Sequence, residues 1–265
     1  MKSNHDAKKI NNPQKGKTQR ERKKIVLKKR FFVILLILAA LIVYAVFAFQ
    51  QHQKQERIIH QAMETADQAA LQYDYDQALS ILEGYQEHKE VQEKLEDYTE
   101  QKAATKKVST DSITHIFFHS LVVDPSRGFS MTENSAWNTG TPGFCQWMTT
   151  AKEFKAILDE MYEKNFVLVD LKDVCDKEMN AGTIRLPKGK KAFVLSLDDL
   201  SYYHSYDNRG IASKIVLNEK NQPVCEYYTK DGQKKTGDYD AVPILDRFIE
   251  EHPDFSYHGA KGTIA

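Results

Sequence analysis

The chain has 265 residues, a length that suits one or two domains, and a formal net charge of zero. This neutrality hides an asymmetry: residues 1–30 contain twelve Lys or Arg against two acidic residues, a net charge of +10, so residues 31–265 carry −10. The basic segment is low in aromatic residues and borders an apolar run. Anionic lipid head groups explain such charge, and we expect no nucleic-acid partner.

Residues 31–49 form an uncharged run of 19 residues, close to the ~20 needed to cross a bilayer as a helix. We predict a transmembrane helix here. A signal peptide cleaved near Val46 or Ala48 is the alternative, although its apolar part normally spans only ~7–15 residues. Basic residues precede the run and are not enriched after it, so the N-terminus is expected in the cytoplasm, as a disordered tail over residues 1–30, and residues 50–265 outside the cell membrane.

Residues 50–106 are expected to form a helical stalk. Gln50 to Thr105 contain no Pro and only Gly84, and apolar residues recur at helical spacing. The stretch AALQYDYDQALSILEGY is similar to part of a tetratricopeptide repeat, but it covers about one repeat, whereas such arrays need at least three. A simple helical spacer is the plainer interpretation, and a partner protein for the stalk stays open.

Strands and helices alternate in residues 107–265. Apolar segments typical of strands lie at residues 113–123, 166–171 and 192–197. A helix between the first two begins with a capping box formed by Thr150 and Glu153. This order predicts an α/β fold with parallel strands.

The pattern changes after Leu200 and then resumes. A β-hairpin insert is expected near residues 210–236, a helix from Asp240 to Glu251, and a further strand opening at residues 255–257. A (β/α) barrel takes ~250 residues, so we expect an incomplete barrel that ends in mid-fold. The three cysteines are odd in number and lack metal-ligand spacing; we interpret them as packing residues, with one disulfide left open.

Asp198 and Asp199 directly follow the strand at 192–197. α/β folds build their sites at the carboxyl ends of strands. There, one carboxylate can ligate a divalent metal while its neighbour acts as general base on a water molecule.

Three segments carry a resemblance to the polysaccharide deacetylases of carbohydrate esterase family four. They are IFFHSLVVD, FCQWMTTAKEFKAILDEMYEKNFVLVDLKDV and LPKGKKAFVLSLDDL, and they match the family's order across about residues 113–200. The resemblance implies that Asp198 is the general base, that Asp199 ligates a divalent metal, usually zinc, and that His119 lines the site. The implied reaction removes N-acetyl or O-acetyl groups from a cell-envelope polysaccharide.

This sequence departs from the family pattern in two ways. Leu197 and Leu200 stand where the family has Phe and Gly, and Ser196 replaces Thr. The family's two metal histidines, spaced His-x-x-x-His, have no match after Asp199. His115 and His119 have that spacing, but on a strand they would lie about 13 Å apart, too far to share a metal.

The sequence therefore predicts a membrane-anchored, externally facing polysaccharide deacetylase, represented by an N-terminal part that is inactive alone. Two alternatives stay open. One is a non-catalytic envelope protein with a degenerate deacetylase domain and a partner-binding stalk. The other is a fragmentary or frameshifted gene product.

Overall fold

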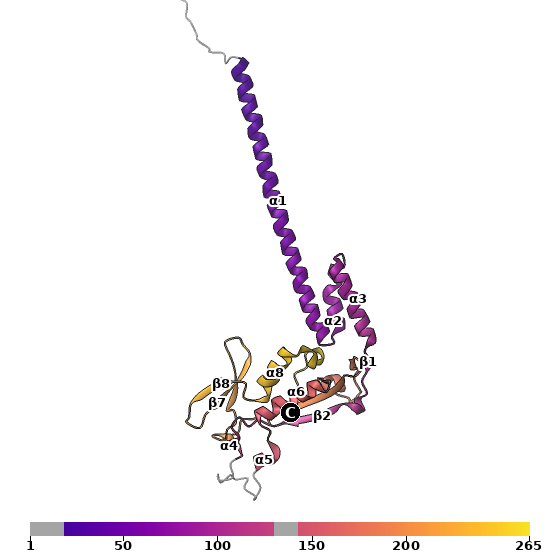
Figure 1. Ribbon diagram of the computed structural model, residues 1–265, viewed down its shortest axis with the longest axis vertical. Coiled ribbons are helices and arrows are strands. Elements are labelled where there is room, and N and C mark those ends of the chain that lie inside the picture. Colours follow the sequence, from indigo (N-terminus) through magenta and orange to yellow (C-terminus); the bar gives the residue numbers. More distant parts are fainter. Residues whose placement is uncertain (1–18, 130–142) are drawn as a thin grey trace, which may run out of the picture. The chain divides into compact units, whose positions relative to one another are not determined.

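The computed structural model describes residues 19–129 and 143–265 (Figure 1). The chain divides into two compact units, residues 1–59 and residues 60–265. Helix α1 (Gln19–Leu71) runs through the first unit and ends in the second. Residues 19–30 are helical, whereas the sequence predicts disorder there, and the remainder of the basic tail lies outside the described residues.

The apolar run at residues 31–49 lies entirely within α1. Its large side chains are exposed, with Phe31 at 68% and Phe49 at 62% of full exposure. This helix near the N-terminus is long and apolar enough to cross a membrane, a property that a membrane span shares with a signal sequence. Protein packing therefore covers none of this surface, which is what lipid contact requires.

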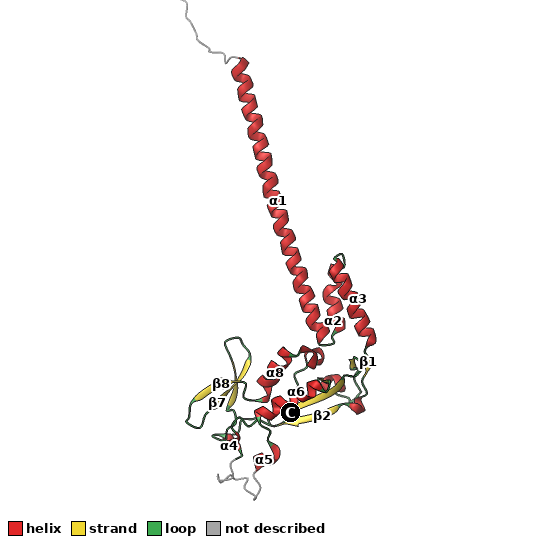
Figure 2. Cartoon of the chain, in the orientation of Figure 1, coloured by secondary structure: helices red, strands yellow, loops and turns green. Residues whose placement is uncertain are grey.

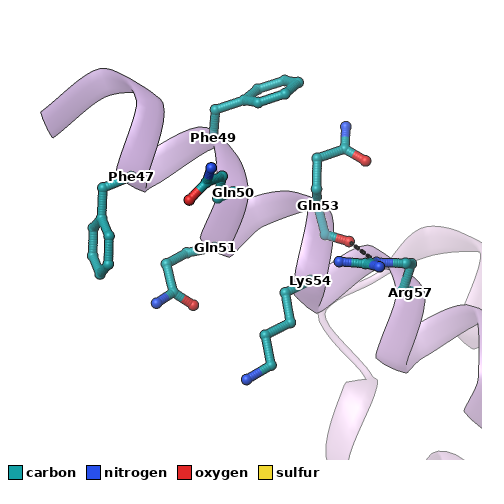
Figure 3. Close-up of a pocket in the computed structure, with 7 residues that line it drawn as sticks. All are labelled: Phe47, Phe49, Gln50, Gln51, Gln53, Lys54 and Arg57. Atoms are coloured by element: carbon teal, nitrogen blue, oxygen red, sulfur yellow. Dashed lines mark hydrogen bonds between the residues drawn. The ribbon is translucent and has the colours of Figure 1, made fainter. Parts of the chain in front are cut away.

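Figure 3 shows a hollow on α1 at the end of the apolar run. It is lined by Phe47 and Phe49, by three glutamines, and by the cations Lys54 and Arg57. Arg57 donates a hydrogen bond from Nε to the carbonyl oxygen of Gln53 at 3.3 Å. All lining residues belong to one helix, so the hollow has no opposing wall to hold a ligand. Aromatic and basic side chains together are typical of a membrane–water interface.

The second unit begins with the end of α1, which is followed by α2 (Tyr75–Leu82), the 3-10 helix η1 (Glu83–Tyr85) and α3 (Lys89–Ala104). Ala78, Leu82 and Val91 are completely buried between these helices. The helical character predicted for this region is confirmed, while its role as a stalk stays a prediction.

The turn after α1 contacts the end of the chain. The Tyr73 hydroxyl donates a hydrogen bond to the carbonyl oxygen of Asp254 at 2.7 Å. The backbone N–H of His258 donates to the carbonyl oxygen of Gln72 at 2.8 Å. These bonds attach the helical segment to the α/β region within the second unit.

A parallel sheet forms the centre of the second unit, shown in yellow in Figure 2. Its strands are β2 (Thr114–Phe118), β3 (Phe166–Leu168), β5 (Lys191–Leu197) and β9 (Thr263–Ile264). The order is β2-β5-β3, and β9 also pairs with β5. Among the described strands no barrel closes. The order is also not sequential, because β5 lies between β2 and β3 rather than after both.

β5 is the most buried strand, with both of its faces covered, as expected for a continuous apolar strand in a parallel sheet. Helices α6 (Ala151–Glu163) and α8 (Ala241–Glu251) cover one face (Figure 1). Phe154, Leu245 and Phe193 belong to one buried cluster there, and complete burial of each such side chain contributes about 1.5–3 kcal/mol. The mixed α/β class is therefore confirmed.

The predicted hairpin insert has a third strand. β6 (Lys214–Leu217), β7 (Pro223–Tyr228) and β8 (Lys234–Gly237) form an antiparallel sheet of their own. The strand predicted to open at residues 255–257 is reduced to one parallel bridge, between Ser256 and Leu168 of β3. The 3-10 helices η4 (Pro253–Phe255) and η5 (Tyr257–Gly259) flank it, and the Ser256 hydroxyl donates to the carbonyl oxygen of Ala260 at 2.7 Å.

The remaining elements are short. They are β1 (Lys106–Lys107), η2 (Thr110–Ser112), α4 (Pro125–Gly128), α5 (Gly143–Trp147), α7 (Leu171–Val174), β4 (Arg185–Leu186) and η3 (His204–Tyr206). The three cysteines are free: Cys145 is exposed, whereas Cys225 is buried, and this burial raises its thiol pKa to about 12.

Candidate functional site

The candidate site lies where β5 ends. The backbone N–H of Asp198 donates to the carbonyl oxygen of Phe118 at 2.8 Å, which extends the pairing of β2 and β5 by one residue. Side chains alternate along a strand, so Asp198 projects from the same face as Ser196, away from the core containing Leu195 and Leu197. Asp198 is half-buried and Asp199 is exposed.

Three side chains on this face form a hydrogen-bonded series. The Ser196 hydroxyl donates to Oδ1 of Asp198 at 2.9 Å, and Nε2 of His115 lies 2.9 Å from the same hydroxyl oxygen. A serine hydroxyl has one proton, and Ser196 uses it on Asp198. The hydroxyl oxygen must therefore accept from His115, which requires a proton on Nε2. The series holds the Asp198 carboxylate in one orientation.

His115 is a candidate site residue that the sequence analysis did not select. It is exposed on β2, as expected for a surface histidine, and the strand pairing gives it a partner. β2 and β5 pair so that His115 lies opposite Val194 and Phe117 opposite Ser196. The ring of His115 thus reaches Ser196, two residues before Asp198.

His119 lies at the same end of the sheet, one residue after β2. Continuing the pairing of Phe118 with Leu197 places it opposite Asp198. Its ring is half-buried and meets Phe117 edge-on at 6.0 Å, and its buried Nδ1 has no hydrogen-bond partner among the described residues. His119 therefore lies at the same end of the sheet as Asp198, and its site-lining role stays a prediction.

The turn after the carboxylates differs from one built on glycine. Asp199 itself adopts a left-handed conformation, with φ of 52°, which Asp tolerates better than most residues. Leu200 is not among the described residues with positive φ. The left-handed residue of this turn is therefore Asp199, and Leu200 does not need the conformational freedom of glycine.

An aromatic cluster lies in the segments beside this turn. Tyr206 meets Phe144 at 5.4 Å and Tyr203 at 5.3 Å, both edge to face, and the guanidinium group of Arg209 lies 5.5 Å from the centre of the Phe144 ring. Burial raises the pKa of Tyr206, with smaller contributions from Tyr203 and from the charge of Asp199. Tyr203 is 44% exposed, so part of the cluster faces solvent. Exposed aromatic faces of this kind suit the apolar faces of sugar rings.

Asp240 connects the loops around the site. Completely buried at the start of α8, it accepts hydrogen bonds from the backbone N–H groups of Leu121 at 3.0 Å and Ala241 at 2.8 Å, and from the Tyr202 hydroxyl at 2.8 Å. Burial raises the pKa of Asp240 above that of an ordinary aspartate, and this effect exceeds the opposite effect of the three hydrogen bonds, which lower the pKa. One carboxylate thereby holds the loops after β2 and β5 against α8.

The described residues do not form a complete metal site. In residues 19–129 and 143–265, no group of three His, Cys, Asp or Glu side chains is placed to hold a metal ion. Catalytic zinc normally has three protein ligands. Asp199, the predicted ligand, therefore lacks partners in this part of the chain.

The chain matches no protein-family model, and no curated protein or solved structure is similar to it. The resemblance to polysaccharide deacetylases accordingly rests on the residues of the sequence segments quoted above.

Proposed function

We propose that residues 107–265 form part of a domain that removes acetyl groups from a cell-envelope polysaccharide, with Asp198 as general base. The observation that carries this proposal is the series His115–Ser196–Asp198. A general base must be held in reach of the proton that it abstracts, and its orientation is commonly set by a second group. The unpartnered Nδ1 of His119 and the nearby aromatic cluster add support for a ligand at this end of the sheet.

The proposed reaction is attack by water on the carbonyl carbon of an acetyl group. Asp198 accepts the proton of the attacking water, the bond from the carbonyl carbon to the sugar nitrogen or oxygen breaks as that atom takes up the proton, and acetate and the free amine or hydroxyl are the products. Ser196 keeps the carboxylate oriented, and His115 keeps the serine hydroxyl directed at it. Asp199 as a ligand of a divalent metal such as zinc is part of the proposal, although the described residues alone do not supply a full ligand set.

The proposed location follows from α1. Residues 31–49 cross the cell membrane, the basic tail contacts anionic lipid on the cytoplasmic side, and residues 50–265 lie outside. A polysaccharide substrate is accessible on that side.

Acetate release from an N-acetylglucosamine oligomer tests the activity, with the full chain in a non-ionic detergent and zinc present. Release above background would overturn the expectation from the sequence that this chain is inactive alone. We expect Asp198→Asn to reduce release to background and Asp207→Asn, an exposed acid in the following loop, to leave it unchanged. Equal release by Asp198→Asn and the natural chain would contradict the role of Asp198.

The incomplete ligand set favours a second candidate, a non-catalytic envelope protein that binds glycan through the aromatic cluster and a partner through its stalk. Binding of the same oligomer without acetate release, weakened by Tyr203→Ala and not by Asp198→Asn, would identify this function.

A further inference from the structure

A second hollow lies at the opposite end of the sheet from Asp198. Its lining includes Thr114, Phe166 and Lys191, the first residues of β2, β3 and β5. β5 has seven residues, so at ~3.3 Å per residue the hollow is separated from the carboxylates by about 20 Å. It is therefore distinct from the candidate catalytic site.

The lining of this hollow is strongly basic. It contains five lysines and no acidic side chain, and the lysines are Lys106, Lys107, Lys188, Lys190 and Lys191. Lys190 pairs with Asp254 at 3.1 Å, whereas the other four form no salt bridge with any described residue. Residues 31–265 together have a net charge of −10, so a hollow lined by four lysines without salt bridges differs in sign from the rest of this segment.

The fold brings the backbone of these four lysines together, and their side chains are exposed. β1 carries Lys106 and Lys107 and pairs antiparallel with β4, which precedes Lys188 by two residues. The Lys191 ammonium lies 4.9 Å from the centre of the Phe166 ring. Serine and threonine hydroxyls of the lining, Ser109 and Thr114, add hydrogen-bond donors at the same place. Exposed ammonium groups with neighbouring hydroxyls are suited to phosphate oxygens.

We propose that this lysine hollow, lined by Lys106, Lys107, Lys188 and Lys191, binds a polyanion that carries at least two phosphate groups. Near neutral pH one phosphate group carries about two negative charges, so a single one leaves part of the +4 charge unbalanced. A phosphodiester-linked or polyphosphate chain supplies the remainder from adjacent groups. The proposal is independent of the deacetylase activity.

Residue-resolved lysine footprinting tests this site in the full chain in non-ionic detergent. Lysines are acetylated briefly with and without tripolyphosphate, and the modification of each is read by mass spectrometry. With the probe at ten times its Kd, acetylation at Lys106, Lys107, Lys188 and Lys191 should slow about tenfold. Lys152 and Lys155, which are exposed on α6 without acidic partners, are the internal controls. The lysines of the basic tail are read separately and do not confuse the result.

A matched pair of variants completes the test. Lys107→Gln with Lys188→Gln should abolish the protection of Lys106 and Lys191, whereas Lys152→Gln with Lys155→Gln should leave it intact. Equal protection of the α6 lysines, or protection confined to the basic tail, would overturn the site. Inorganic phosphate that protects as well as tripolyphosphate would overturn the requirement for two phosphate groups.

Discussion

Asp240 is completely buried, yet both of its carboxylate oxygens accept hydrogen bonds. Asp240→Ala removes the cap of α8 and leaves the Leu121 N–H and the Tyr202 hydroxyl without their partner. We expect the free energy of unfolding to fall by about 2–5 kcal/mol, measured by urea denaturation of the full chain in detergent. Asp159→Ala, at an exposed position of α6, should change it by less than about 0.5 kcal/mol.

The same carboxyl predicts a pH dependence. Burial raises the pKa of Asp240 in the folded chain, so the folded state binds this proton more readily than the unfolded state. The stability of the natural chain relative to Asp240→Asn should therefore rise as the pH falls through the folded-state pKa toward the ordinary value of about 3.9. An unfolding free-energy difference that is constant from pH 7 to pH 4 would contradict this.

Ser196 provides a test of orientation within the candidate site. Ser196→Ala removes the bond to Asp198 and the contact with His115, and we expect acetate release to slow about tenfold, corresponding to about 1.4 kcal/mol. Ser196→Thr retains a hydroxyl and should restore most of the rate. If both variants lose activity while their free energy of unfolding is unchanged, loss of the hydroxyl is not the cause.

The sequence predicts the two carboxylates of the candidate site but not the contact between His115 and Ser196. Asp198 and Asp199 are predictable because a continuous apolar strand ends immediately before them. The contact of His115 with Ser196 joins residues 81 positions apart and depends on how two strands pair. One sequence does not specify that pairing, so its local pattern leaves His115 without a partner.

At the scale of elements, α6 is the helix whose start is encoded most locally. The Glu153 N–H donates to the Thr150 hydroxyl at 3.0 Å, and the Thr150 N–H donates to the Glu153 carboxylate at 2.9 Å, so the predicted capping box is confirmed. Thr150→Ala should lower the free energy of unfolding by about 1 kcal/mol, measured by thermal or urea denaturation. Glu163→Gln, exposed in the last turn of the same helix, is the control.

The carboxyl group of Glu153 in this capping box also makes the stability depend on pH. The Thr150 hydroxyl and N–H hold the pKa of Glu153 below its ordinary value, so its stabilisation is complete above the unfolded-state pKa and is lost as the pH falls through the folded-state pKa. The stability difference between the natural chain and Glu153→Gln should therefore be present at pH 7 and shrink toward about pH 3. A difference independent of pH would contradict the ionised cap.

Elements whose shape depends on distant contacts were harder to predict. The segment at residues 255–257 has an apolar pattern that suits a strand, but Ser256 bonds within its own turn and Tyr257 packs against Tyr73, with ring centres 6.5 Å apart. The order β2-β5-β3 likewise follows from packing between distant segments, whereas a sequential barrel follows from the alternation of elements alone.

At the scale of the whole molecule, the exposed thiol of Cys145 reports on membrane topology. A membrane-impermeant maleimide added to intact cells should label Cys175→Ser and not the double variant Cys145→Ser with Cys175→Ser, because residues 50–265 are proposed to lie outside and Cys175 is itself half-buried. Cys225 is buried and should react only after unfolding. If labelling requires cell lysis, the C-terminal region lies in the cytoplasm and the proposed orientation is wrong. A mature chain that begins after residue 48 would identify the apolar run as a cleaved signal.

The parallel pairing of the central sheet also has a consequence for biosynthesis. Antiparallel hairpins such as β6-β7 form between neighbours as soon as both are made, but β2 has no partner until β5 has emerged from the ribosome. Contacts between distant segments slow folding because a long loop must close before they form. The apolar strand β2 thus stays without its sheet partner while residues 119–190 are made, and the central sheet assembles only after β5 has emerged.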